Sequence, residues 1–187
     1  MKNTPEYLKD AKTLLSDKGF ATSNVWYHGT SSMLANAILK DGLKRSGDKA
    51  MKQAAKQTMA TIGNNYTESI EPIFLTQSKE LAYYWAEQRV YERQVRFNSD
   101  ETSAIIEISL DDQLNAGVKP DVGAASLLMI KEGEAFMAYV AAVYEGAGIP
   151  VPDIDLMKAD RLEYLDKLGM AYYDKNIDAS ALRLVEA

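Results

Sequence analysis

In the first part of the chain, the apolar residues follow a helical period, then form a short strand-like run, and then follow a helical period again. The apolar stripe within residues 4–15, which Gly19 ends, predicts a first helix. Residues 24–28 form a short apolar run that predicts a buried strand. Ser31 or Ser32 then caps a helix whose apolar residues share one face and which Gly42 ends. This region therefore predicts a strand–turn–helix unit.

A second unit with the same order follows. Residues 48–62 are rich in Ala, Lys, Gln and Met and predict a solvated helix. Residues 73–76 predict a second strand, and Ser78 caps a long helix that reaches about Gln94. Alternation over residues 102–110 predicts a third strand.

Helix-forming residues dominate the chain after Val122. Residues 124–144 predict a helix broken by Gly133, and Asp153 or Asp155 caps another that ends near Leu168. Residues 169–173 then predict a closing strand.

Composition narrows the class of protein. A chain of 187 residues with 47% hydrophobic content can form one domain, so we expect a single domain over 1–187, with about 122–168 as a helical insertion. The absence of cysteine excludes disulfides and thiolate catalysis, and a single histidine argues against a zinc site. A net charge of -6 argues against phosphate-driven binding to long nucleic acid. Without an apolar run of about 20 residues or a signal peptide, we expect no membrane association and a cytoplasmic location.

The chemistry-bearing residues gather at the first predicted strand. It reads Val25-Trp26-Tyr27-His28-Gly29-Thr30 and carries the only histidine of the chain. A histidine at a strand end can bond a ribose hydroxyl, a glycine lets a carboxamide approach bare backbone, and a hydroxyl adds a polar contact. An aromatic ring from the next helix, Tyr83 or Tyr84, could stack on a flat ligand ring.

The order and spacing of these motifs over residues 24–110 resemble the histidine-type branch of the ADP-ribosyltransferase superfamily, in particular uncharacterised bacterial or phage members. Poly(ADP-ribose) polymerase catalytic domains and diphtheria toxin belong to the same branch. The resemblance implies an α+β fold with a split, mostly antiparallel sheet and flanking helices. Ile73 stands where the family often has a second tyrosine, which would make one wall of the nicotinamide slot aliphatic.

The same resemblance implies a function and a site. NAD would be the co-substrate of a mono-ADP-ribosyltransferase that modifies a protein or nucleic-acid acceptor and releases nicotinamide. His28 and Tyr84 would be the catalytic residues. The residues that would contact NAD are Tyr27, His28, Gly29, Thr30, Thr76, Tyr83 and Tyr84.

The third catalytic residue stays open. Many members of the superfamily place a glutamate at the start of a late strand, where it stabilises developing positive charge. Glu132-Gly133-Glu134 resembles the Glu-x-Glu of the arginine-modifying branch, but the stretch after it predicts a helix. If the late strand is 169–173 instead, Met170 or Ala171 takes the place of the acid, as in members that do not elongate chains or have lost activity.

Two alternatives keep the same fold. One is a non-catalytic domain that binds NAD or ADP-ribose or serves as an interaction domain, which a missing acid permits. The other is an RNA 2'-phosphotransferase, which needs several arginines around a phosphate, whereas Arg45, Arg89 and Arg93 are scattered. A basic cluster follows the motif helix and could meet pyrophosphate or be an ordinary solvated face; it consists of Lys44, Arg45, Lys49, Lys52 and Lys56.

Overall fold

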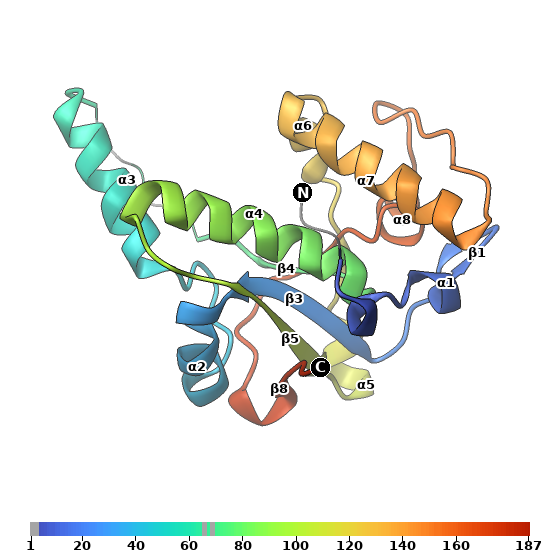
Figure 1. The fold of residues 1–187 in the computed structure, drawn as a ribbon, viewed down its shortest axis with the longest axis horizontal. Helices are drawn as coiled ribbons and strands as arrows, with labels where there is room; N and C mark the ends of the chain where they lie inside the picture. Colours follow the sequence, from blue (N-terminus) through green and yellow to red (C-terminus); the bar gives the residue numbers. More distant parts are fainter. Residues whose placement is uncertain (1–3, 65–66, 68–69) are drawn as a thin grey trace.

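The computed structural model describes residues 4–64, 67 and 70–187 and has an α+β architecture with antiparallel sheets (Figure 1). One sheet has the order β3-β5-β8, from β3 (Val25–Ser31), β5 (Ser103–Ser109) and β8 (Leu182–Leu184). The other has the order β4-β7-β6, from β4 (Ile73–Leu75), β7 (Ala171–Tyr173) and β6 (Lys119–Pro120). The short strands β1 (Leu15–Ser16) and β2 (Gly19–Phe20) pair separately.

Helices surround the sheets. They are the 3-10 helix η1 (Glu6–Leu8), α1 (Ala11–Leu14), α2 (Ser32–Asp41), α3 (Lys49–Thr61), α4 (Lys79–Phe97), α5 (Asp112–Asn115), α6 (Ala124–Leu128), α7 (Lys131–Ala147), α8 (Arg161–Asp166) and the 3-10 helix η2 (Ala179–Ala181). In Figure 1, α4 crosses β3 and β5, α3 lies at its C-terminal end, and α6 and α7 lie toward its N-terminal end.

Within the described residues, one β-bridge joins the two three-stranded sheets. Tyr27 of β3 donates its N–H to the Thr76 carbonyl at 2.7 Å and accepts from the Thr76 N–H at 3.0 Å. Pairing stops there, so β3 and β4 separate beyond the bridge. We call this place the β3–β4 split and define it by residues 27–31 and 73–76.

Two large apolar clusters hold the described fold, together with a smaller one between α4 and the sheet that contains Leu8, Ala82, Ala86 and Ile105. One lies between the sheets and α2 and contains Trp26, Ala35, Leu75, Ile106 and Ile108. The other lies around α4 and α7 and contains Tyr84, Phe136, Val140, Tyr144 and Tyr164. The sheet is therefore covered on one face by α2 and on the other by α4, which fixes the positions of the motif residues on β3.

The predicted first helix is interrupted. In place of one helix over residues 4–15, the chain forms η1, then α1, then β1. Asp10 lies at the interruption, and its carboxylate accepts from the Ser78 hydroxyl at 2.6 Å and the Lys79 N–H at 2.8 Å. This contact across 68 residues of chain cannot be seen in a local apolar period.

Two details of the helical region also differ from the prediction. Gly133 does not break the helix, because it is buried inside α7, where an added Cβ would lie 2.3 Å from the Leu127 carbonyl oxygen. The break falls at residues 129–130. The last helix begins at Asp160, not Asp153 or Asp155, because Asp160 and Glu163 form a reciprocal capping box.

The strand–turn–helix units are confirmed. The observed strands β3, β4 and β5 and helices α2 and α4 lie at the predicted places, with Ser78 as the N-cap of α4 and Gly42 as the C-cap of α2 at φ 84°. The segment 122–168 is mainly helical, and β7 lies in the predicted closing strand.

Candidate functional site

Gly29 is fixed by its contact with α4. A Cβ added at this position would lie 2.1 Å from the Ala82 carbonyl oxygen and 2.6 Å from the Ala86 nitrogen. Both atoms belong to the helix backbone, so no rotamer change could make room. Gly29 therefore lets α4 lie directly on β3, and Ala82 and Ala86 form the face of the helix that meets the strand.

The main chain of Gly29 faces the β3–β4 split. Ser32 donates to Thr102, and Leu110 donates to Asn24, so the even-numbered residues of β3 exchange hydrogen bonds with β5. The odd-numbered residues face the other edge, as the bond from Tyr27 to Thr76 shows. By this alternation the N–H and C=O of Gly29 point toward β4. No hydrogen bond joins Gly29 to β4 within the described residues, so one donor and one acceptor lie side by side at the split.

His28 is held by a single hydrogen bond across the split. Its Nδ1 lies 2.9 Å from the carbonyl oxygen of Phe74 in β4. Because a carbonyl oxygen only accepts, Nδ1 carries the proton in the neutral ring. Burial lowers the pKa of His28 below its ordinary value of 6.5, the bond to Phe74 opposes that shift, and the charge of Arg89 adds to it. The neutral ring then presents Nε2 as an acceptor, and Nε2 has no partner in the described part of the chain.

The helical period places Arg89 on the side of α4 nearest the split. Glu87, on the opposite side of the helix, bonds Ser103 of β5. Arg89 follows Ala86 of the contact face by three residues, which places it on the other side of α4 from Glu87. Trp85 packs instead on Phe136 of α7, with ring centroids 4.7 Å apart. The charge of Arg89 acts on His28, which is consistent with this placement.

Tyr84 lies away from the split. Only 3% of it is exposed, and its ring lies 4.9 Å from the ring of Tyr139 and 5.3 Å from that of Phe136, centroid to centroid. Because Ala82 and Ala86 face β3, the residue between them faces α7. The structure therefore does not bring Tyr84 to His28, and a ring covered in this way has no open face for nicotinamide.

The other predicted contacts divide among structural roles. Tyr27 is half-buried under α4, and burial with the nearby Glu107 charge raises the pKa of Tyr27 to about 12. Thr30 and Thr76 are buried, and Thr76 makes the bridge to β3. Tyr83 lies on the β5 side of α4. Of the predicted residues within the split, His28 offers the Nε2 acceptor and Gly29 its main-chain N–H and C=O.

The two placements of the third residue are now distinguished. Glu132 and Glu134 lie in the first turn of α7, so they are not on a strand and do not form the Glu-x-Glu arrangement of a late strand. Met170 and Ala171 lie at the start of β7 and are buried. Buried apolar residues therefore lie at the start of β7.

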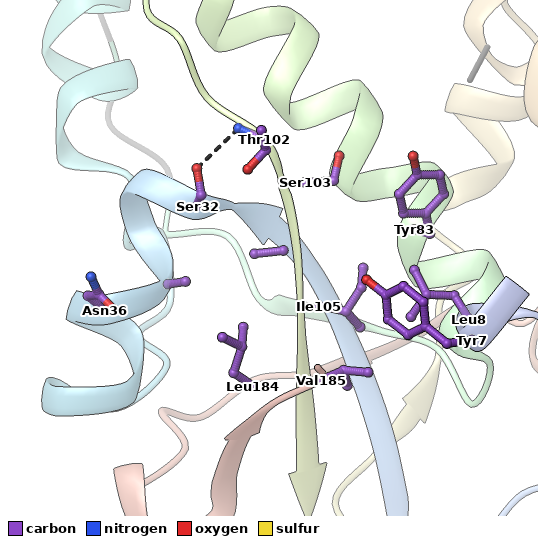
Figure 2. Close-up of a pocket in the computed structure, with 12 residues that line it drawn as sticks. Tyr7, Leu8, Ser32, Asn36, Tyr83, Thr102, Ser103, Ile105, Leu184 and Val185 are labelled. Carbon is purple, nitrogen blue, oxygen red and sulfur yellow. Dashed lines mark hydrogen bonds between the residues drawn. The ribbon is translucent and has the colours of Figure 1, made fainter. Parts of the chain in front are cut away.

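Two hollows lie elsewhere. One of about 370 Å³ lies at the β5 edge, between α2, α4 and β8, and Figure 2 shows Tyr7, Tyr83, Ser103 and Leu184 around it. The other, of about 410 Å³, lies near Leu110 and Ile177. His28 and Gly29 line neither hollow. We place the candidate site at the split because donor, acceptor and imidazole converge there.

The described residues contain no group of three or more His, Cys, Asp or Glu side chains that could hold a metal ion. In the same residues, no helix has the length and apolar character needed to cross a membrane. Comparison with family models, curated proteins and solved structures gives no match to this chain.

Sequence reasoning missed Arg89 as a neighbour of His28 at the split. A signal was present, because Ala82 and Ala86 are four residues apart and a glycine on the strand offers them a place to pack. That pairing sets the rotation of α4, and with it the side on which each aromatic residue lies.

Proposed function

We propose that this protein is a mono-ADP-ribosyltransferase of the histidine type, which uses NAD and releases nicotinamide. The observation that carries the proposal is the pairing, at one split, of the Gly29 main-chain donor and acceptor with the Nε2 acceptor of His28. A nicotinamide carboxamide has one acceptor oxygen and a donor NH₂, so it complements the N–H and C=O of a single residue.

The reaction would divide between the two residues. Gly29 would hold the carboxamide, and His28 Nε2 would accept a hydrogen bond from a ribose hydroxyl and so fix the sugar. The C1'–N bond then breaks, and its electron pair goes to the ring nitrogen, which leaves as neutral nicotinamide. The acceptor's nucleophile bonds C1' and releases its proton. Positive charge develops on the ribose, and a residue that stabilises it would be supplied from outside β7.

The second candidate function is a non-catalytic NAD-binding or ADP-ribose-binding domain. Met170 and Ala171 favour it, because they put buried apolar side chains at the start of the late strand. Such a domain would hold the ligand at Gly29 and His28 without breaking the glycosidic bond.

The test is release of nicotinamide from NAD labelled in the nicotinamide ring, with and without a cell lysate as a source of acceptors. The proteins are the wild type, His28→Ala, and Asn36→Ala as a control that alters the hollow of Figure 2 instead. If the protein is a transferase, nicotinamide release requires both lysate and His28, and Asn36→Ala releases nicotinamide like the wild type. Release without lysate means NAD hydrolysis, and binding of ADP-ribose without release supports the second candidate. If the wild type neither releases nicotinamide nor binds ADP-ribose, both candidate functions are overturned.

The pH profile adds a check on the role of His28. Since its pKa lies below 6.5, the neutral ring persists at pH 6.5, and release should decline only below that pH. A decline that begins well above pH 6.5 would contradict a neutral His28 as the acceptor.

A further inference from the structure

Building on the proposed function, we infer that Arg89 binds the pyrophosphate of the dinucleotide at the β3–β4 split. The first argument is position. Ala86 lies on Gly29, and Arg89 follows it by three residues, so its side chain starts beside the place where the carboxamide would lie. An arginine side chain is long enough to reach a phosphate attached to the neighbouring ribose.

The second argument is that Arg89 is free to bind. Its one hydrogen bond in the described residues is with Glu92 on the same helix, at 3.0 Å, and the two side chains are 42% and 52% exposed. Exposed pairs of this kind hold a guanidinium weakly. A phosphate, which accepts two parallel N–H bonds from a guanidinium, would compete well for Arg89.

The third argument concerns the other positive groups of α4. The N-terminus of the helix cannot receive a phosphate, because the Asp10 carboxylate accepts from the N–H groups of Lys79 and Glu80. Arg93 is bound by two carboxylates, and Arg96 bonds α3 through Ala54 and Thr58. Lys79 Nζ donates to the Tyr7 carbonyl oxygen at 3.2 Å. Among the positive side chains of α4, Arg89 is thus the one whose hydrogen bond in the described residues stays within the helix.

The test separates the phosphates from the rest of NAD. ADP-ribose carries the pyrophosphate, and nicotinamide riboside carries none. Their dissociation constants are measured for the wild type, Arg89→Gln, and Arg161→Gln, which makes the same charge change at an exposed residue of α8. Arg89→Gln should raise the dissociation constant of ADP-ribose about 10- to 100-fold and change that of nicotinamide riboside by less than about twofold. Arg161→Gln should leave both within about twofold.

Two further variants sharpen the result. Arg89→Lys keeps the charge and loses the planar fork, so it should restore only part of the ADP-ribose affinity. Glu92→Gln removes the competing carboxylate and should tighten ADP-ribose by up to about threefold. The inference is overturned if Arg89→Gln loses equal affinity for ADP-ribose and nicotinamide riboside. It is also overturned if Arg89→Gln loses no more ADP-ribose affinity than Arg161→Gln. If the wild type binds neither compound, the proposed function fails, and the inference fails with it.

Discussion

Arg89 and Arg93 lie one turn apart on α4 in opposite surroundings. Arg93 is 7% exposed in its side chain, and its Nε donates to Glu101 at 2.6 Å while its Nη1 donates to both oxygens of Asp48. Arg89 is 42% exposed and bonds a neighbour on its own helix. The same side chain is therefore a fixed structural link at one position and an available ligand group at the other.

The Arg93 network explains how the end of α4 is anchored. Asp48 caps α3 by accepting from the Met51 N–H, and Glu101 lies two residues before β5. Arg93 thus ties α3, α4 and the start of β5 together with buried charges. Buried ion pairs add little when intact, but removing one partner leaves a charge without compensation. The comparison predicts that changes near Arg93 affect folding, and that a change at Arg89 affects binding.

The largest expected effect is from Arg93→Gln. The substitution leaves Glu101 buried without its cation, so we expect a loss of about 3–5 kcal/mol in the free energy of unfolding. Urea unfolding followed by circular dichroism measures it. A loss below about 1 kcal/mol would mean that the network is solvated in solution, and the contrast with Arg89 would disappear.

The next effect is from Tyr84→Ala. Because the ring packs against Tyr139 and Phe136 in the core, we expect a loss of about 3–4 kcal/mol in the free energy of unfolding. The matched variant Tyr84→Phe keeps the ring and should cost less than about 1 kcal/mol. Wild-type stability in Tyr84→Ala, combined with lost NAD binding, would restore the catalytic role predicted for Tyr84.

Gly29→Ala tests the contact that orients α4. The new Cβ meets helix backbone, and we expect a loss of about 2–3 kcal/mol with loss of NAD binding as α4 moves. Gly146→Ala is the control, because nothing lies within 4 Å of its added Cβ in α7, and there alanine should stabilise by about 0.5–1 kcal/mol. Equal melting temperatures for Gly29→Ala and the wild type would contradict the close packing.

Lowering the pH tests the Arg93–Glu101 interaction without a mutation of Arg93. Burial raises the pKa of Glu101, but hydrogen bonds from Arg93 and Ser99 outweigh it and lower that pKa to about 2 from an ordinary 4.5. The ionised form is favoured in the folded state, so its contribution to stability is complete above pH 4.5 and is lost as pH falls toward 2. Unfolding free energies between pH 6 and 3 should therefore fall less in Glu101→Gln than in the wild type.

The sequence predicted the elements better than the site. Strand and helix periods located β3, β4, β5, α2 and α4, because local pattern and tertiary packing agree there. The local period could not show that Asp10 would leave its helix to cap α4, or that Asp160 would begin α8. His28 and Gly29 were predicted together because one strand carries both. Tyr84 was assigned to the wrong side of α4 in space, since helix rotation depends on a contact between residues 29, 82 and 86.

The smallest expected effect completes the comparison. Arg89→Gln removes an exposed ion pair with Glu92, so the free energy of unfolding should change by less than about 0.5 kcal/mol. The measurement is urea unfolding beside Arg93→Gln under the same buffer. Because both variants exchange arginine for glutamine on one helix, helix propensity and net charge change alike, and the difference between them reports burial. If both variants lose a similar amount of unfolding free energy, Arg89 is also structural. Weaker ADP-ribose binding in Arg89→Gln would then be explained by the loss of stability, without a contact between Arg89 and phosphate.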